Sequence, residues 1–115
     1  MKRLAFLVCF ALAGCKGEAP ALGGDPQAGK LLLRQYGCGT CHEIPRVAGA
    51  DGKVGPPLAH LATRVYLAGR IANTPANLAH WIRHPQAVDP RSAMPDMQVT
   101  EAHARDMVAY LYTLK

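Results

Sequence analysis

Residues 38–42 of this 115-residue chain are Cys38-Gly39-Thr40-Cys41-His42. Two cysteines three positions apart, with a histidine directly after the second, form the C-x-x-C-H signature of covalent c-type haem attachment. On a turn that leads into a helix, both thiols project to the same side, so each can bond one former vinyl group of a porphyrin. His42 then lies under the iron, where its imidazole serves as the proximal ligand. The motif predicts one covalently bound haem c.

The motif has two other interpretations, a redox dithiol of the thioredoxin type and half of a four-ligand zinc site. Zinc would require a second Cys or His pair at the motif's own spacing, with two residues between its members, which the sequence does not contain. A redox dithiol does not need a histidine directly after it. Haem attachment is therefore the interpretation that uses all three side chains.

Helices are expected on both sides of the motif. Asp25 can cap a first helix over Pro26–Gln35, Pro26 suits its first position, and Gly37 ends it. Gly29 lowers the helix propensity of this segment, so it has either no special role or a place at a close helix crossing. The residues expected near one side of this helix are Ala28, Leu31, Leu32, Gln35 and Tyr36.

The second half of the chain carries similar signals. Leu58–Ala68 predicts a helix or a pair of turns, and Thr74-Pro75 begins a helix that Pro85 stops. Residues 86–99 are irregular, and Thr100 caps a last helix. The apolar stripe of that helix consists of Ala104, Met107, Val108, Leu111 and Leu114. No segment shows the pattern of a strand, so the predicted fold class is all-α.

A segment rich in proline and glycine, Gly55-Pro56-Pro57-Leu58, is a candidate for lining the His42 side of the haem. A proline carbonyl there could accept the Nδ1–H of the histidine, which would fix the ring and make the ligand more electron-rich. Taken alone, the segment is an ordinary Pro-rich turn.

Seven side chains could supply the second axial ligand: Met94, Met97, Met107, His60, His80, His84 and His103. Met107 falls on the apolar stripe and is expected in the core, while the histidines fall on helix surfaces or ends. Met94 lies in irregular chain between Ala93 and Pro95, where a methionine can be aimed at iron without breaking a helix. Met94 is therefore the favoured ligand and Met97 its rival. His/Met ligation would raise the reduction potential.

The first 14 residues have the pattern of a signal peptide. Met1-Lys2-Arg3 is basic, and Leu4–Ala13 is an apolar run too short to span a bilayer as a mature helix. Leu12-Ala13-Gly14-Cys15 resembles a bacterial lipobox, which implies cleavage before Cys15 and acylation of its sulfur. The alternative is ordinary signal cleavage with Cys15 an incidental thiol. Residues 15–24 are expected to be a flexible tether to one domain over 25–115.

The cysteine count and the charge agree with an exported haem protein. Cys9 falls in the signal and Cys15 would carry lipid, which leaves the two motif cysteines and none for a disulfide. Removal of Lys2 and Arg3 leaves 11 basic against 8 acidic side chains, a net charge of +3 that two haem propionates bring near +1. The basic residues are scattered, so nucleic acid is not an expected partner.

The chain resembles the class I cytochromes c over residues 25–115. The family's motifs occur here in its order and approximate spacing, namely Cys38–His42, Gly55-Pro56-x-Leu58, Met94-Pro95 and Ala109-Tyr110-Leu111. The resemblance implies about four helices around one haem, with the first and last helices crossing where Gly29 matches Tyr110. It also assigns Pro56 as the carbonyl partner of His42 and Met94 as the distal ligand.

Residues 73–86 look especially like the cytochrome c domain fused to subunit II of some bacterial haem–copper oxidases. The copper domain and membrane hairpin of those proteins do not precede it here, so the resemblance implies the electron-transfer role alone and not membership of an oxidase. Family members often place a Trp or an Arg near the haem propionates, which nominates Trp81 and Arg70. The alternatives are a core residue for Trp81 and a solvated side chain for Arg70.

The resemblance implies an electron carrier rather than an enzyme, a monomer whose iron cycles between Fe(III) and Fe(II) in a bacterial respiratory or periplasmic chain. Its partners would be redox proteins, namely a membrane oxidase or a dehydrogenase. The protein would bind them while it is lipid-anchored at the periplasmic face of an envelope membrane. A dedicated haem subunit of one such enzyme is an alternative. A haem-based gas sensor is another, and it would need an open sixth site.

Overall fold

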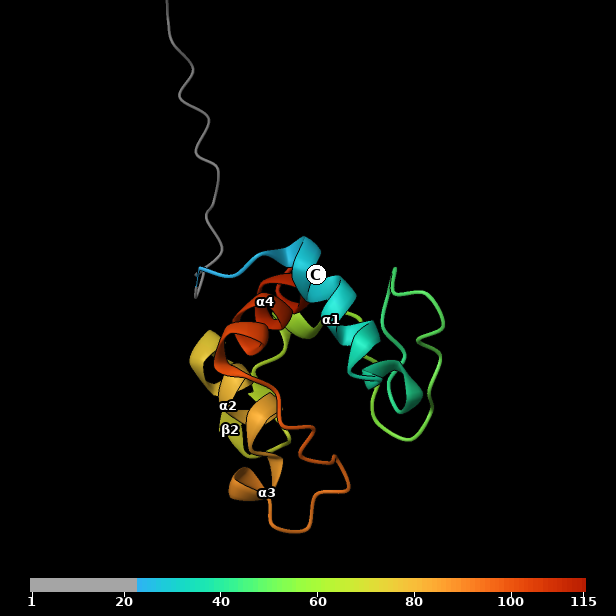
Figure 1. Cartoon of the computed structure of the whole chain (residues 1–115). Coiled ribbons are helices and arrows are strands. Elements are labelled where there is room, and N and C mark those ends of the chain that lie inside the picture. The colour runs from blue at the N-terminus through green and yellow to red at the C-terminus, as the bar shows by residue number, and fades with distance from the viewer. Residues whose placement is uncertain (1–22) are drawn as a thin grey trace, which may run out of the picture.

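The computed structural model describes residues 23–115, which are mostly helical, as the sequence predicted. The α-helices are α1 (Pro26–Gln35), α2 (Pro75–Arg83), α3 (Pro85–Val88) and α4 (Glu101–Leu111) (Figure 1). The shorter elements are 3₁₀ turns at Cys38–Thr40 and Leu61–Thr63 and the two-residue strands β1 (Tyr66–Leu67) and β2 (Ile71–Ala72). The expected signal peptide, Cys15 and most of the expected tether lie outside the described residues.

Local capping sets where the helices begin. The Oδ1 atom of Asp25 accepts the backbone N–H groups of Gln27 and Ala28 at 2.8 and 3.3 Å, so α1 has the predicted cap and the predicted bounds. Thr74 and Thr100 cap α2 and α4 in the same way, through their Oγ1 atoms. Each cap satisfies a backbone donor that the first turn of a helix leaves free.

The first and last helices cross at Gly29, as the resemblance implied (Figure 1). A Cβ atom built on Gly29 would lie only 1.9 Å from the carbonyl oxygen of Asp106, so a side chain there would hold α1 and α4 apart. The backbone N–H of Asp25 donates to Oδ1 of Asp106 at 2.8 Å and fastens the same crossing. Tyr110 lies about one turn further along α4. Its hydroxyl donates to the carbonyl of Pro45 at 2.6 Å, which ties α4 to the loop after the C-x-x-C-H motif.

The buried stripe of α4 is the one predicted, and it consists of Ala104, Met107, Val108 and Leu111, followed by Leu114 beyond the helix end. The buried side of α1 was predicted wrongly in part. Leu31 is 67% exposed, whereas Leu33 is 2% exposed and packs in the core beside Leu32. The close crossing at Gly29 turns α1 so that Leu33, rather than Leu31, lies toward the core.

Leu58–Ala68 does not form an α-helix. A three-residue 3₁₀ turn is followed by the antiparallel pair β1–β2, in which Tyr66 lies opposite Ala72. Of the two alternatives predicted for this segment, the pair of turns fits, and the prediction of no strands was wrong here. His60 and Ala68 have φ angles of 59° and 51°, in the left-handed region. A right-handed helix cannot run through such residues, which is why the segment turns twice instead.

The segment between the motif and the 3₁₀ turn at Leu61–Thr63 has small contacts of its own. Ile44, Val47 and Ala50 are buried, and a Cβ atom on Gly39 would lie 2.6 Å from Ala50.

Residues 86–99, predicted to be irregular, are so except for the short α3 at their start. Within residues 23–115, no helix is both long enough and apolar enough to cross a membrane.

Candidate functional site

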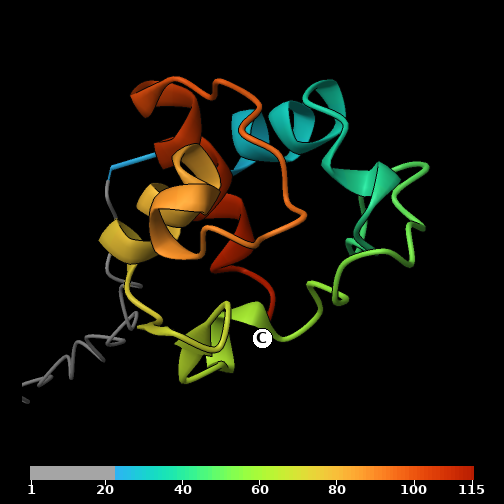
Figure 2. The ribbon, with the colours of Figure 1, turned by 90° about the horizontal axis from the view of Figure 1, so that it is seen from below.

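A mainly apolar cavity of about 400 Å³ lies between the C-x-x-C-H motif and the helices that follow it. Its walls come from the end of α1, the motif, residues 54–68, α2, the segment before α4, and α4 itself. Figure 2 shows these elements, with the motif in teal and the segment before α4 in orange. Its buried apolar side chains include Leu33, Leu61, Leu78, Ile82, Met107 and Leu111. The volume lies in the range of pockets that enclose a cofactor.

The motif reaches this cavity because the chain turns sharply after α1. Gly37 has φ 73°, which reverses the backbone, and Cys38 begins a 3₁₀ turn in which its carbonyl accepts from the N–H groups of Cys41 and His42 at 3.3 and 3.0 Å. The two cysteines and the histidine all line the cavity. Burial raises the pKa of the Cys38 thiol, so this sulfur stays protonated near neutral pH.

The imidazole of His42 is oriented by the loop that follows it. Its Nδ1 atom lies 2.7 Å from the carbonyl oxygen of Pro56, the pair of residues that the resemblance nominated. A carbonyl can only accept, so Nδ1 carries the proton and Nε2 keeps its lone pair free for a metal. Such a partner fixes the ring and makes the ligand more basic.

Gly55 allows this arrangement. A Cβ atom on Gly55 would lie 2.4 Å from Cε1 of His42 and 2.7 Å from its Nδ1, so only a glycine lets the loop backbone approach the ring so closely. The N–H of Gly55 also donates to the carbonyl of Cys41 at 2.7 Å, which holds the loop against the motif.

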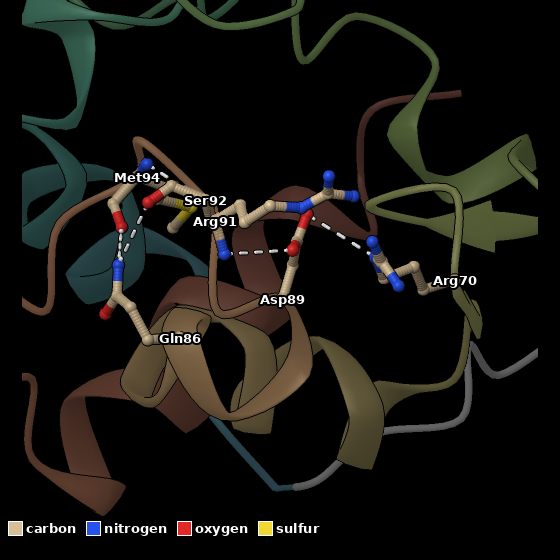
Figure 3. Close-up of polar contacts among 6 residues, drawn as sticks. All are labelled: Arg70, Gln86, Asp89, Arg91, Ser92 and Met94. Carbon is tan, nitrogen blue, oxygen red and sulfur yellow. Dashed lines mark hydrogen bonds and ion pairs between the residues drawn. The ribbon is translucent and has the colours of Figure 1, made fainter.

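Met94 and Met97 both line the cavity. Met94 is half-buried, while Met97 is 45% exposed. The backbone of Met94 is held on both sides, because its N–H donates to Oγ of Ser92 at 3.1 Å and its carbonyl accepts from Nε2 of Gln86 at 2.7 Å (Figure 3).

The two residues nominated for the propionates lie in different places. Trp81 lines the cavity and is half-buried against the core. Arg70 is not among the lining residues. Its Nε lies 3.4 Å from Oδ2 of Asp89, a carboxylate at the cavity wall (Figure 3). The structure thus brings together Cys38, Cys41, His42, Pro56, Met94 and Trp81, and leaves Arg70 outside.

Sequence reasoning missed Arg64, the arginine that does line the cavity. Its guanidinium donates to the carbonyl oxygens of Pro57 and Ala59, so it is fixed to the loop that also holds His42. In the sequence, Arg64 is an isolated basic residue after Leu61-Ala62-Thr63, a context that many surface arginines share. Asp89 was missed for a similar reason, because only the fold brings residue 89 to this wall.

These residues fit a haem. Two thiols, an imidazole with a free Nε2 and an apolar enclosure are the groups that covalent haem attachment requires. Within residues 23–115 there is no cluster of three or more His, Cys, Asp or Glu side chains that could hold a bare metal ion.

Comparison with known proteins agrees with this geometry. The structure is similar to that of cytochrome c2 from Rhodobacter sphaeroides, with 22% sequence identity, a TM-score of 0.56, and coverage of 79% of this chain and 96% of that one. At that identity the likeness shows the fold. No curated protein matches the sequence. The family model for cytochrome c matches residues 26–115. This chain therefore belongs to the cytochrome c family, as a class I electron-transfer protein with one covalently attached haem c.

Proposed function

We propose that this protein carries single electrons in a bacterial respiratory or periplasmic chain, with its haem iron held between His42 and Met94. The bound haem supplies the Fe(III)/Fe(II) couple. The chain's own part is to hold two axial side chains, to exclude water with an apolar wall, and to keep the same geometry in both oxidation states.

The hydrogen bond from Nδ1 of His42 to the carbonyl of Pro56, inside an apolar cavity, is the observation that carries this proposal. It supports a strongly donating, fixed proximal ligand rather than a mobile one. Met94 is favoured over Met97 as the distal ligand because it is less exposed and its backbone is held at both N–H and carbonyl. A side chain bound on each side of the iron would leave no open position for a gas.

The optical spectrum of the oxidised protein tests the ligand assignment. A weak charge-transfer band at the red end, from sulfur to ferric iron, is expected in the wild type and in Met97→Ala, and is expected to be absent in Met94→Ala. A band lost only in Met97→Ala would make Met97 the ligand. A wild type without the band, whose ferrous form takes up CO readily, would replace the carrier by a gas-binding protein.

We also propose that Cys15 is acylated and tethers the domain to the periplasmic face of an envelope membrane, where a membrane oxidase or dehydrogenase is its partner. The support is the sequence pattern of residues 1–15, in which Cys15 ends the lipobox-like stretch. Several acyl chains give stable anchoring, whereas one chain is marginal. The wild type is expected in the detergent phase with a lipid-bearing N-terminal peptide by mass spectrometry, and Cys15→Ser in the aqueous phase. Equal partitioning of the two would exclude the lipid anchor.

A further inference from the structure

We infer that Gln86 is a positioning residue for Met94, an inference that rests on the proposed His42/Met94 ligation. The segment that carries Met94 is mostly irregular, so helix or sheet hydrogen bonds do not hold it in place. Among the described residues, the side-chain contacts to the backbone of residues 91–94 come from Gln86, Asp89 and Ser92, near the start of the same segment (Figure 3). Further along, Oδ1 of Asp96 accepts from the N–H of Gln98, and Nε of Arg83 donates to the carbonyl of Val99.

The amide of Gln86 makes two of these contacts. Its Nε2 atom lies 2.7 Å from the carbonyl oxygen of Met94 and 3.2 Å from that of Ser92. Both partners are carbonyls and can only accept, so the nitrogen end of the amide must face them and donate to both. The Gln86 side chain therefore closes the turn that leads into Met94, although Gln86 lies eight positions earlier in the sequence.

The backbone that carries the Gln86 side chain is itself held in place by its neighbours. Gln86 follows Pro85, which is buried, in the first turn of α3. Nearby, Oδ1 of Asp89 accepts the N–H of Arg91 at 3.1 Å, and its Oδ2 lies 3.4 Å from the guanidinium of Arg70. The start of the segment is thus joined both to α3 and to the turn between β1 and β2.

These contacts bear on ligation because they hold the backbone on each side of the Met94 side chain. On displacement of the sulfur the segment would move away from Gln86, and the two bonds would be lost with it. The bonds therefore add to the stability of the ligated state and not to that of the displaced state. Removing them is expected to make Met94 about tenfold easier to displace, the loss expected from one or two neutral hydrogen bonds.

Displacement of Met94 by imidazole in the oxidised protein tests this inference. Gln86→Ala is expected to need about tenfold less imidazole than the wild type to lose half of the red sulfur–iron band. Gln86→Glu keeps the size of the side chain, but its ionised carboxylate can only accept and would face two carbonyl oxygens. It should therefore be displaced at least as easily as Gln86→Ala. The matched controls are Gln27→Ala and Gln27→Glu at an exposed position of α1, and both should behave as the wild type does.

The outcomes separate this inference from the ligand assignment. If Met94→Ala keeps the band, the His42/Met94 proposal fails, whatever Gln86 does. If Met94→Ala loses the band but both Gln86 variants need the wild-type concentration of imidazole, the ligand assignment stands and the role of Gln86 is refuted. If Gln86→Glu is as resistant as the wild type while Gln86→Ala is not, packing rather than donation holds the segment, and the inference is likewise wrong.

Discussion

The crossing of α1 and α4 at Gly29 predicts that Gly29→Ala destabilises the protein, although alanine is the better helix former. In a free helix the change would add up to about 1 kcal/mol of stability. Here the new Cβ atom would lie 1.9 Å from the carbonyl oxygen of Asp106, while real contacts of this kind are not shorter than 3.0 Å, so the helices must separate by about 1.1 Å. The obstacle is backbone, so a side-chain rotation cannot relieve it.

Overpacking of this kind costs about 1–3 kcal/mol, and the separation also loosens contacts of buried Leu33 and Met107. We expect a net loss of about 2 kcal/mol, which lowers the thermal midpoint by roughly 8–16 °C in a domain of this size. Urea unfolding followed by far-UV circular dichroism measures the difference. Gln27→Ala, on the exposed side of the same helix, should change stability by less than about 0.5 kcal/mol. A Gly29→Ala variant as stable as the wild type would refute the close crossing.

Three further changes have expected outcomes. Gly55→Ala would place a Cβ atom 2.4 Å from Cε1 of His42, so it should displace the imidazole. The reduction potential measured by voltammetry should therefore change, and an unchanged potential would contradict the contact. Asp25→Ala removes the acceptor of two N–H groups in α1 and should cost about 1 kcal/mol in urea unfolding. Burial raises the pKa of Tyr112 above its ordinary value near 10, so the folded state binds more protons than the unfolded state above pH 10. The stability that Tyr112 contributes should therefore be intact below pH 10 and fall above it. In urea unfolding measured at several pH values, the midpoint of Tyr112→Phe should fall less steeply above pH 10 than that of the wild type. Equally steep falls in the two proteins would argue against this.

Some features follow from residues that are neighbours in the chain. The C-x-x-C-H motif places two thiols and an imidazole together by its spacing alone. Asp25, Thr74 and Thr100 cap helices through N–H groups two or three residues away, so the starts of three helices were predictable from local chemistry. The apolar stripe of α4 was predictable for the same reason, since helical periodicity is a local property.

Other features depend on contacts between distant residues. Leu33 rather than Leu31 is buried because α1 is oriented by its crossing with α4, some 77 residues later. Arg64 reaches the cavity and Arg70 does not, because the left-handed turns at His60 and Ala68 set the path of the chain between them. No periodic pattern in residues 58–72 predicts these left-handed turns.

Five consecutive residues therefore determine the haem chemistry. The surroundings of the haem are determined only by the folded chain. Hydrogen-bonded caps and motif spacings act over one helical turn, so a single sequence specifies them. The carbonyl of Pro56 on Nδ1 of His42 and the amide of Gln86 on the carbonyl of Met94 join residues 14 and 8 positions apart. Their geometry depends on how irregular segments fold against the motif and against α3, and only the tertiary structure fixes that.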